Sequence, residues 1–292
     1  MLDLSHIPSQ QQQTYTFYAT GNWQTWNKPR NAKMIEIFCL GAGGSGAHTQ
    51  FSVVAVAGGG GGASGGIVRG LIPAFLLPDT IHILVGKGAA GPATLNTNGS
   101  NGGISYVGIQ PSTSEQTLIC KSSTTTAGGA VVPNTGGTAA TVSVVALSAF
   151  GNLGLFTAIA GVAGSGGGPS GANIGSSQGA LGSSIVTGGA GGGGKSTTTF
   201  AVGGNINAAS AVLTTQVRGG VNAAENGADG YGTLQPFCGT GGAGGAGIVT
   251  GVGGRGGNGF YGCGGGGVGA GSTGTSKAGD GGDGLVIITV IT

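Results

Sequence analysis

Glycine is clustered in this chain, and the clusters limit what the chain can fold into. Between positions 239 and 284, 24 of the 46 residues are glycine, whereas the first 40 residues contain only Gly21. Glycine loses more backbone freedom on folding than any other residue, at a cost of roughly 0.5–1 kcal/mol relative to alanine in regular structure. These segments therefore either stay disordered or gain compensation from close backbone packing and many hydrogen bonds.

The composition favours the ordered alternative. Disordered glycine-rich linkers are usually polar, but only 6% of this chain is charged and 38% is hydrophobic. Residues 241–247 repeat as Gly-Gly-Ala, and residues 253–259 repeat as Gly-Gly-X. A three-residue period matches a left-handed helix with three residues per turn and no internal hydrogen bonds. Because neighbouring backbones can then bond to one another, we expect polyglycine II-type helices packed side by side.

Short apolar or alternating runs between the glycine blocks predict β-strands. We expect strands at residues 15–18, 33–40, 80–85, 104–109, 117–120, 142–147 and 285–291. No segment keeps a helical period over ten or more residues. The predicted fold class is therefore all-β: a β-sandwich or jelly-roll-like core with inserted polyglycine II-type helices and no substantial α-helix.

The strands also predict the organisation of the chain. Residues 1–14 are polar and are expected to form a flexible N-terminal arm, a possible attachment peptide. Residues 15–292 are expected to form one glycine-rich β domain, closed by the C-terminal strand. That last strand is predicted to pair near the strand at 33–40 or the strand at 80–85.

Motifs that suggest chemistry lack the context they need. Residues 41–46 fit G-x-G-x-x-G, but a strand-like run follows instead of the helix that would meet a pyrophosphate. Residues 62–66 fit the G-x-S-x-G nucleophile elbow around Ser64 without its strand–turn–helix setting. Asp280 and Asp283 resemble a calcium repeat only faintly, and a turn before the last strand is favoured. We therefore predict no enzymatic activity, no cofactor and no metal.

Charge and hydropathy argue against several classes of protein, and the cysteines indicate buried positions. A formal net charge of +2 gives no electrostatic footprint for nucleic acid. No apolar run is long enough to span a bilayer, and the first residues do not fit a secretory signal. Cys39 and Cys120 lie in apolar runs and are interpreted as buried small hydrophobes. A disulfide between Cys238 and Cys263 is left open.

The order of several features resembles one family. Trp23 and Trp26 precede Lys28-Pro29, and a strand then runs into Gly-Ala-Gly-Gly at 41–44. A Ser-Gly-Gly at 64–66, a Thr-Ile-His-Ile-Leu-Val-Gly-Lys-Gly run at 80–88 and a closing Gly-Asp-Gly-Leu-Val-Ile-Ile at 282–288 follow. Over residues 15–292 this order resembles the glycine-rich domains of bacteriophage tail fibres, spikes and adhesins. It is also similar in plan to the glycine-rich domain of anaplastic lymphoma kinase, whose kinase domain and membrane span have no counterpart in this sequence.

The resemblance implies a non-enzymatic protein on the virion surface, often a homotrimer, that contributes to host attachment through variable loops. Its expected partners are a host surface receptor or glycan and, through the N-terminal arm, other virion proteins. The alternatives are a structural decoration or connector protein of the virion and, third, an ice-binding protein.

Receptor contacts are predicted in the polar segments 96–101, 122–134, 196–207 and 225–237. The candidate contact residues are Asn96, Asn98, Asn101, Asn134, Asn205, Asn207, Glu225, Asp229 and Tyr231. Tryptophans more often cap a core than stack on a sugar, so Trp23 and Trp26 are assigned structural roles. Pro29, which follows them, is assigned a structural role as well.

Overall fold

The computed structural model describes residues 12–122, 126–139, 154–177, 185–207, 215–232 and 239–292. Within these ranges the chain forms nine β-strands and two single-turn 3-10 helices, and no α-helix. The predicted all-β class is therefore confirmed. The predicted strand at 142–147 lies outside the described residues.

Two antiparallel sheets form a sandwich. The five-stranded sheet has the order β1 (Gln12–Phe17), β9 (Leu285–Ile291), β3 (Met34–Leu40), β4 (Ile67–Pro73) and β8 (Phe156–Ile159). The four-stranded sheet has the order β2 (Gln24–Asn27), β5 (Thr80–Leu84), β6 (Tyr106–Gly108) and β7 (Leu118–Lys121). The helix η2 (Ala74–Leu76) follows β4, and η3 (Glu115–Thr117) precedes β7. Strand β9 pairs with β3 along its full length, as one of the two predicted alternatives requires.

The core lies between the sheets because alternate residues of each strand point inward. In β3 the buried inward residues are Ile35, Ile37 and Cys39, and their neighbours on β9 are Val286, Ile288 and Val290. The four-stranded sheet adds residues of β5, β6 and β7: Ile81, Ile83, Val107, Ile119 and Cys120. Cys39 and Cys120 are thus buried core residues, as predicted.

Strand β9 is apolar on both faces because its second face is also covered. Leu285 and Ile287 pack with Phe38 and Leu40 of β3 in a separate cluster. Val186 and Cys263, from two glycine-rich segments, complete this cluster. Coverage on both sides explains why the run at 285–291 lacks polar alternation.

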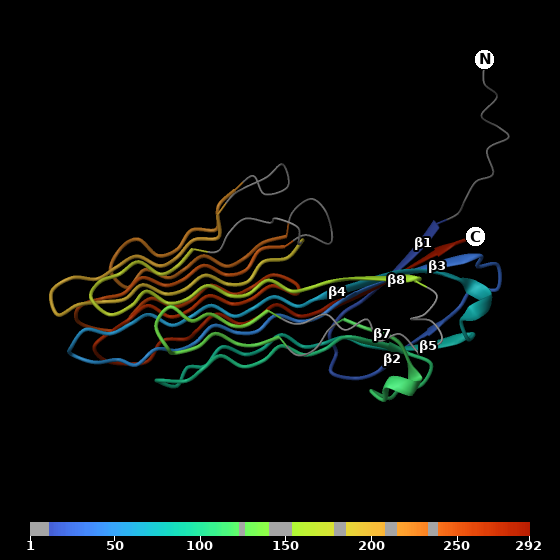
Figure 1. The fold of residues 1–292 in the computed structure, drawn as a ribbon, viewed down its shortest axis with the longest axis horizontal. Helices are drawn as coiled ribbons and strands as arrows, with labels where there is room; N and C mark the ends of the chain where they lie inside the picture. Colours follow the sequence, from blue (N-terminus) through green and yellow to red (C-terminus); the bar gives the residue numbers. More distant parts are fainter. Residues whose placement is uncertain (1–11, 123–125, 140–153, 178–184, 208–214, 233–238) are drawn as a thin grey trace, which may run out of the picture.

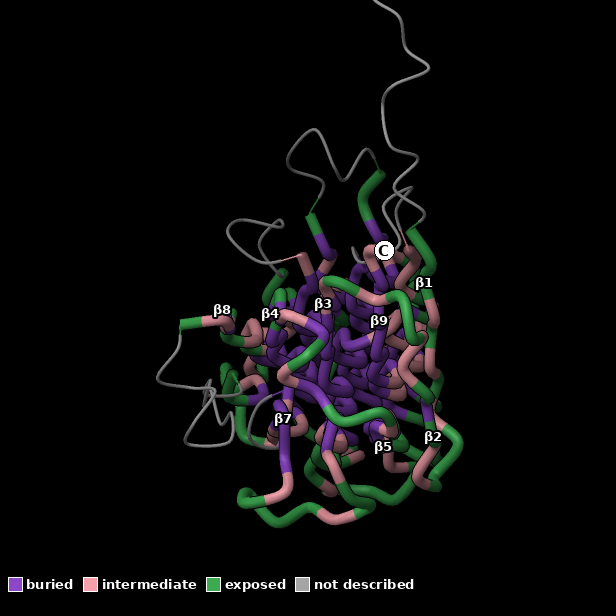
Figure 2. Tube along the Cα trace, turned by 90° about the vertical axis from the view of Figure 1, so that its right-hand side faces the viewer, coloured by how far each residue is buried: buried purple, intermediate pink, exposed green. Residues whose placement is uncertain are grey.

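The glycine-rich segments extend from the sandwich as a bundle of parallel rods (Figure 1). Strands β3 and β5 continue directly into such rods, and other rods lead back into β4 and β9. Viewed from the sandwich end, the buried residues fill the centre and the exposed residues form the rim (Figure 2). Most residues of the rods are buried glycine or alanine, so the interior of the bundle is mainly backbone.

Hydrogen bonding in the bundle has the three-residue period that the sequence predicts. Rod 41–48 donates its N–H groups in rotation to three neighbours, the rods at 60–66, 97–103 and 279–282. The N–H groups of residues 41, 44 and 47 donate to the carbonyl oxygens of residues 66, 63 and 60, respectively. Those of residues 42, 45 and 48 donate to residues 103, 100 and 97, and those of residues 43 and 46 donate to residues 282 and 279. These distances are 2.8–3.1 Å. This is the geometry of polyglycine II helices, which bond only between neighbours.

Close packing explains the need for glycine in these rods. A methyl group on Gly43 would lie 1.9 Å from the carbonyl oxygen of Cys263. No side chain fits in that space, so the rods could not approach to hydrogen-bonding distance with alanine at this position.

The structure also corrects two boundaries and adds three strands. Strand β1 begins at Gln12, so residues 12–14, assigned from the sequence to the arm, are part of the sheet. Residues 1–11 lie outside the described residues. Strand β6 covers only residues 106–108 of the predicted 104–109. Strands β2, β4 and β8 were not predicted because polar residues or a glycine interrupt their apolar patterns.

Candidate functional site

The molecule has two different ends (Figure 1). The C-terminus and the start of β1 lie at the sandwich end, on the right of the figure, and the turns that connect the rods lie at the opposite end. We call these connections the distal turns. They are residues 49–56, 92–97, 131–135, 169–174, 196–200, 222–225, 248–252 and 271–277.

Exposed apolar side chains gather in the distal turns. Among the described residues, seven of the eleven large hydrophobic residues that are exposed lie there: Val53, Val54, Leu95, Val132, Ile174, Phe200 and Val252. The most exposed are Val53, at 77%, and Ile174, at 63%. Apolar side chains gathered on one part of a surface are typical of interaction sites. The distal turns are therefore the candidate functional site.

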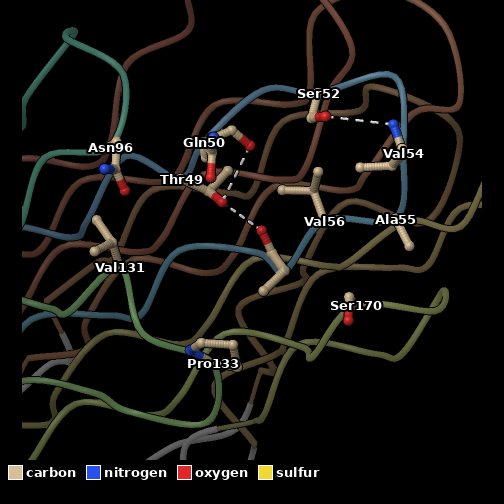
Figure 3. A pocket seen from close by; sticks show the side chains of 11 residues that line it. Thr49, Gln50, Ser52, Val54, Ala55, Val56, Asn96, Val131, Pro133 and Ser170 are labelled. Atoms are coloured by element: carbon tan, nitrogen blue, oxygen red, sulfur yellow. Dashed lines mark hydrogen bonds between the residues drawn. The ribbon is translucent and has the colours of Figure 1, made fainter.

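A hollow of about 280 Å³ lies among four of these turns (Figure 3). Turn 49–56 and Ala57 form most of its wall, and Asn96, Val131, Pro133 and Ser170 close it from three other turns. Its side chains are hydroxyl, amide and aliphatic groups, and none of them carries a charge. A hollow of this chemistry suits a neutral group with both polar and apolar surface.

Hydrogen bonds hold the main wall of the hollow in place. The hydroxyl of Thr49 donates to the carbonyl oxygen of Ala57 across the turn. The Ser52 hydroxyl accepts from the backbone N–H of Val54 at 3.3 Å. The ring of His48 packs on Phe51 with 5.2 Å between centroids. The turn therefore presents Val53 and Val54 on a braced backbone.

The buried residue Lys195 makes contacts with three distal turns. Its side chain is fully buried, and its ammonium group donates to the carbonyl oxygen of Val249 at 3.1 Å. Its backbone pairs with Val56 and with Phe200. Burial lowers the pKa of the Lys195 ammonium below its ordinary value. The turns at 49–56, 196–200 and 248–252 thus share one buried anchor.

Most of the predicted contact residues brace neighbouring rods. The amide oxygens of Asn98, Asn101 and Asn205 accept backbone N–H groups of Val131, Gly128 and Gly219 at 2.9, 3.3 and 2.7 Å, respectively. Asn207 accepts from the Gln216 side chain at 3.2 Å. Such side chains satisfy donors at the edge of the bundle, where no further rod follows.

Two predicted asparagines lie in the distal turns themselves. Asn96 and Asn134 have φ angles of 53° and 59°, the left-handed conformation that asparagine tolerates better than most residues. Asn96 also lines the hollow. Asn96 directly follows the exposed Leu95 in the chain, and Asn134 lies two residues after the exposed Val132.

Asp229 and Tyr231 also bond to neighbouring segments. The carboxylate of Asp229 accepts from the Arg255 guanidinium at 2.8 Å and from the N–H of Asn258 at 2.7 Å. The Tyr231 hydroxyl donates to the carbonyl oxygen of Thr215. Segments 122–134 and 225–237 are only partly described, because residues 123–125 and 233–238 lie outside the described residues. Contact of these groups with a receptor stays a prediction.

Glu225 closes the distal turn at 222–225. Its carboxylate accepts from the N–H groups of Asn222 and Val221 at 2.8 and 2.9 Å. These two bonds, the one from Asn222 foremost, lower the pKa of Glu225 below its ordinary value. The charged carboxylate is thus the form that the folded turn prefers.

Acid is therefore expected to loosen this turn. A depressed pKa stabilises the turn above the ordinary glutamate pKa of about 4.3, and this contribution is lost as the pH falls through the lower folded value. Hydrogen exchange, corrected for intrinsic rates, should show the amides of Val221 and Asn222 losing protection over that range. The Glu225→Gln variant should show no such pH dependence. Identical profiles for both proteins would contradict this assignment.

The three residues assigned structural roles lie at the sandwich. Trp26 is buried in the core and packs edge-to-face on Tyr15 with 5.7 Å between centroids. Trp23 is half-buried and lies near Tyr106, at 6.4 Å. The carbonyl oxygen of Pro29 accepts from the N–H of Ala32 at 3.2 Å.

Ser64 of the G-x-S-x-G match and the histidine His48 both form hydrogen bonds within the bundle. Ser64 is buried, and its hydroxyl accepts from the N–H of Val162 at 2.7 Å. His48 is also buried, and its Nε2 accepts from the N–H of Ser276 at 3.2 Å. In the part of the chain that the structure describes, no three His, Cys, Asp or Glu residues are grouped as metal ligands. No described helix is long and apolar enough to cross a bilayer.

Asp280 and Asp283 bond to the rod that follows β5. Asp280 accepts from the N–H of Gly91 at 2.6 Å, and Asp283 accepts from the N–H of Gly88 at 2.7 Å. Asp280 also pairs with Lys277 at 2.8 Å on the surface. Both carboxylates thus fasten one rod to another.

Removing the Asp280 carboxylate should lower the free energy of unfolding more than removing its surface partner Lys277. Asp280→Ala leaves the buried N–H of Gly91 without that acceptor, which should lower the free energy of unfolding by about 1–3 kcal/mol. Lys277→Ala breaks only the exposed ion pair and should cost less than about 1 kcal/mol. Urea denaturation of both variants measures the difference. Equal losses of unfolding free energy would contradict the role of Asp280 in fastening one rod to another.

The fold and the candidate site together define a class: a β-sandwich extended by a bundle of polyglycine II helices with an exposed set of turns. The chain belongs to the glycine-rich domain family, whose sequence profile matches residues 18–290. A search of curated proteins gave no significant match.

The exposed apolar residues of the distal turns were not among the predicted site residues. Val53 and Val54 lie in the run 51–56, which looks like a short strand that splits a glycine block. The signal that could have found them is their position: an apolar run between two polyglycine segments must occupy a turn at an end of the bundle.

Proposed function

We propose that this protein is a non-enzymatic surface protein of a bacteriophage particle, a fibre or spike that contributes to host-cell attachment. In this proposal the sandwich end faces the particle, and the distal turns contact a host surface receptor or glycan. The protein acts at the virion surface, as a homotrimer, with its N-terminal arm, the residues before β1, contacting other virion proteins.

One observation carries the proposal: the exposed apolar side chains are concentrated at the end of the molecule opposite the sandwich. A rigid bundle holds them away from the body of the domain, as a displayed contact surface requires. Several copies held side by side would add weak contacts into an avid attachment. The glycine positions of the rods leave no space for side chains, so contact specificity would vary in the turns.

A second function, a structural decoration or connector protein of the virion, has its own support. Four exposed apolar residues lie on the sandwich, among them Phe75 at 83%, Leu71 at 47% and Ile159 at 40%. Such a surface suits attachment to another protein of the particle. In that role the bundle would be a passive extension.

Binding of fluorescently labelled protein to candidate host cells distinguishes the two functions. A receptor-binding protein should bind one host saturably, and whole virions should compete for the same sites. A well-folded oligomer that binds none of the hosts on which the phage grows would overturn host attachment and favour decoration.

A further inference from the structure

The two sheets of the sandwich converge where the strands enter the bundle. Facing sheets are commonly about 10 Å apart. Here the segment after β3 bonds directly to the segment before β6, since the N–H of Ala42 donates to the carbonyl oxygen of Gly103 at 3.0 Å. The Ser105 hydroxyl also donates to the carbonyl oxygen of Leu40 at 2.7 Å. The sheets therefore form a wedge that closes at this end.

Two thiols from opposite sheets meet in this wedge. Cys39 lies near the end of β3, and Cys120 lies on β7 beside Val107 of β6. Both are free thiols in the same core cluster, with exposures of 0% and 1%. Both side chains belong to one continuous packed cluster, and the Cys120 thiol is near enough to Cys39 to help raise its pKa. The Cys39 thiol also lies 3.5 Å from the carbonyl oxygen of Ser105, to which it donates.

We propose that Cys39 and Cys120 are a redox pair that closes into a disulfide across the sandwich when the protein meets a small-molecule disulfide such as oxidised glutathione. The thiolate of one cysteine attacks the oxidant, forms a mixed disulfide and releases one small thiol. The thiolate of the other cysteine then attacks the mixed disulfide and releases the second small thiol. Two protein thiols lose two protons and two electrons, and the oxidant takes them up as its S–S bond breaks.

The bond would join β3 to β7 at the junction between the sandwich and the bundle. No backbone hydrogen bonds connect these two strands, because they belong to different sheets. A covalent link there ties residue 39 to residue 120 and limits the freedom of the unfolded chain. The link would therefore hold the sheets together against opening.

Burial controls when the bond forms. Burial, and secondarily the contact with Cys120, raises the pKa of the Cys39 thiol well above its ordinary value. Only the thiolate attacks a disulfide, so oxidation of the folded protein is slow. Closure is expected mainly during folding, or while the wedge is transiently open.

The test is to refold the full chain in glutathione buffers of increasing oxidised fraction. After denaturing alkylation and proteolysis, mass spectrometry should find the Cys39 peptide joined to the Cys120 peptide. A Cys238–Cys263 bond would give different peptides, so the two pairings are told apart. The oxidised protein should unfold at a temperature roughly 5–10 °C above that of the reduced protein.

Two matched variants, Cys39→Ala and Cys120→Ala, each leave one thiol of the pair. In either variant oxidised glutathione should no longer raise the unfolding temperature, and the joined peptide should disappear. Native-like wild-type protein whose two thiols remain fully alkylatable after oxidising refolding would overturn the proposal. Pairing of either cysteine with Cys238 or Cys263 would overturn it as well. Disulfide mapping of the wild-type protein tests the proposal even if a variant does not fold.

Discussion

Replacing Gly266 with alanine is expected to lower the free energy of unfolding by about 3–5 kcal/mol, through overpacking and lost hydrogen bonds. The added methyl carbon would lie 2.0 Å from the carbonyl oxygen of Ala243 and 2.6 Å from its carbonyl carbon. Backbone atoms cannot turn away as a side chain can, so two rods must separate.

The separation would break the bonds that Gly266 makes to other neighbours. Its N–H donates to the carbonyl oxygen of Gly257 at 2.8 Å, and its carbonyl accepts from the N–H of Gly279 at 2.9 Å. A loss of about 3–5 kcal/mol is a large share of the 5–15 kcal/mol typical of a folded protein. Urea denaturation followed by circular dichroism measures it.

The same substitution at Gly21 is the matched control. Gly21 lies outside the bundle, has a φ of 80°, and has no heavy atom within 4 Å of the position that a Cβ would occupy. Alanine there meets only backbone strain, with an expected cost of about 1 kcal/mol. If Gly266→Ala cost no more than Gly21→Ala, close backbone packing would not be the reason for the glycines.

The sequence predicted the kind of structure in the glycine blocks because their period is a local property. Three residues per turn follow from the Gly-Gly-X pattern, and the bonds of rod 41–48 confirm that period. The choice of neighbours was not predictable. Rod 41–48 bonds to residues 279–282, far along the chain. One polyglycine backbone presents the same donors and acceptors as another, so the sequence contains little information about which rods meet.

In the sandwich, the strands with a long apolar or alternating pattern were predicted, and those without one were not. Strands β3, β5 and β9 have long apolar or alternating runs and were predicted close to their observed bounds. Strand β2 has a single buried residue, Trp26, and strand β4 is interrupted by Arg69 and Gly70. Hydrogen bonds to neighbouring strands hold both β2, which pairs with β5, and β4, which lies between β3 and β8, so neither needs much apolar pattern of its own and single-sequence reasoning overlooked both.

The candidate site was predicted only in part, for a chemical reason. An asparagine amide in a polar segment suits a receptor contact and a rod-to-rod bond equally well. In the structure Asn98 and Asn205 make bonds of the second kind. Only the three-dimensional arrangement shows which backbone donors lie at the edge of the bundle and need an acceptor.

Charging the distal turns is expected to weaken attachment at least about tenfold if they are the receptor contact. The double variant Val53→Asp and Ile174→Asp puts two carboxylates into the exposed apolar set. Burying an unpaired charge against a partner is unfavourable, so binding to host cells should weaken by at least about tenfold. Both side chains are more than half exposed, at 77% and 63%, so folding should be retained. Cell binding by the labelled variant, beside its circular dichroism, measures the effect.

Phe75→Asp is the matched control because it places the same charge at an equally exposed apolar residue of the sandwich end. Phe75 is 83% exposed, on η2. Under the attachment proposal this variant should bind host cells as the wild type does, although its incorporation into particles should suffer. If instead Phe75→Asp abolished cell binding and the distal variant bound normally, the contact surface would be the sandwich end. The glycine bundle would then point away from the host, and the roles proposed for the two ends would be reversed.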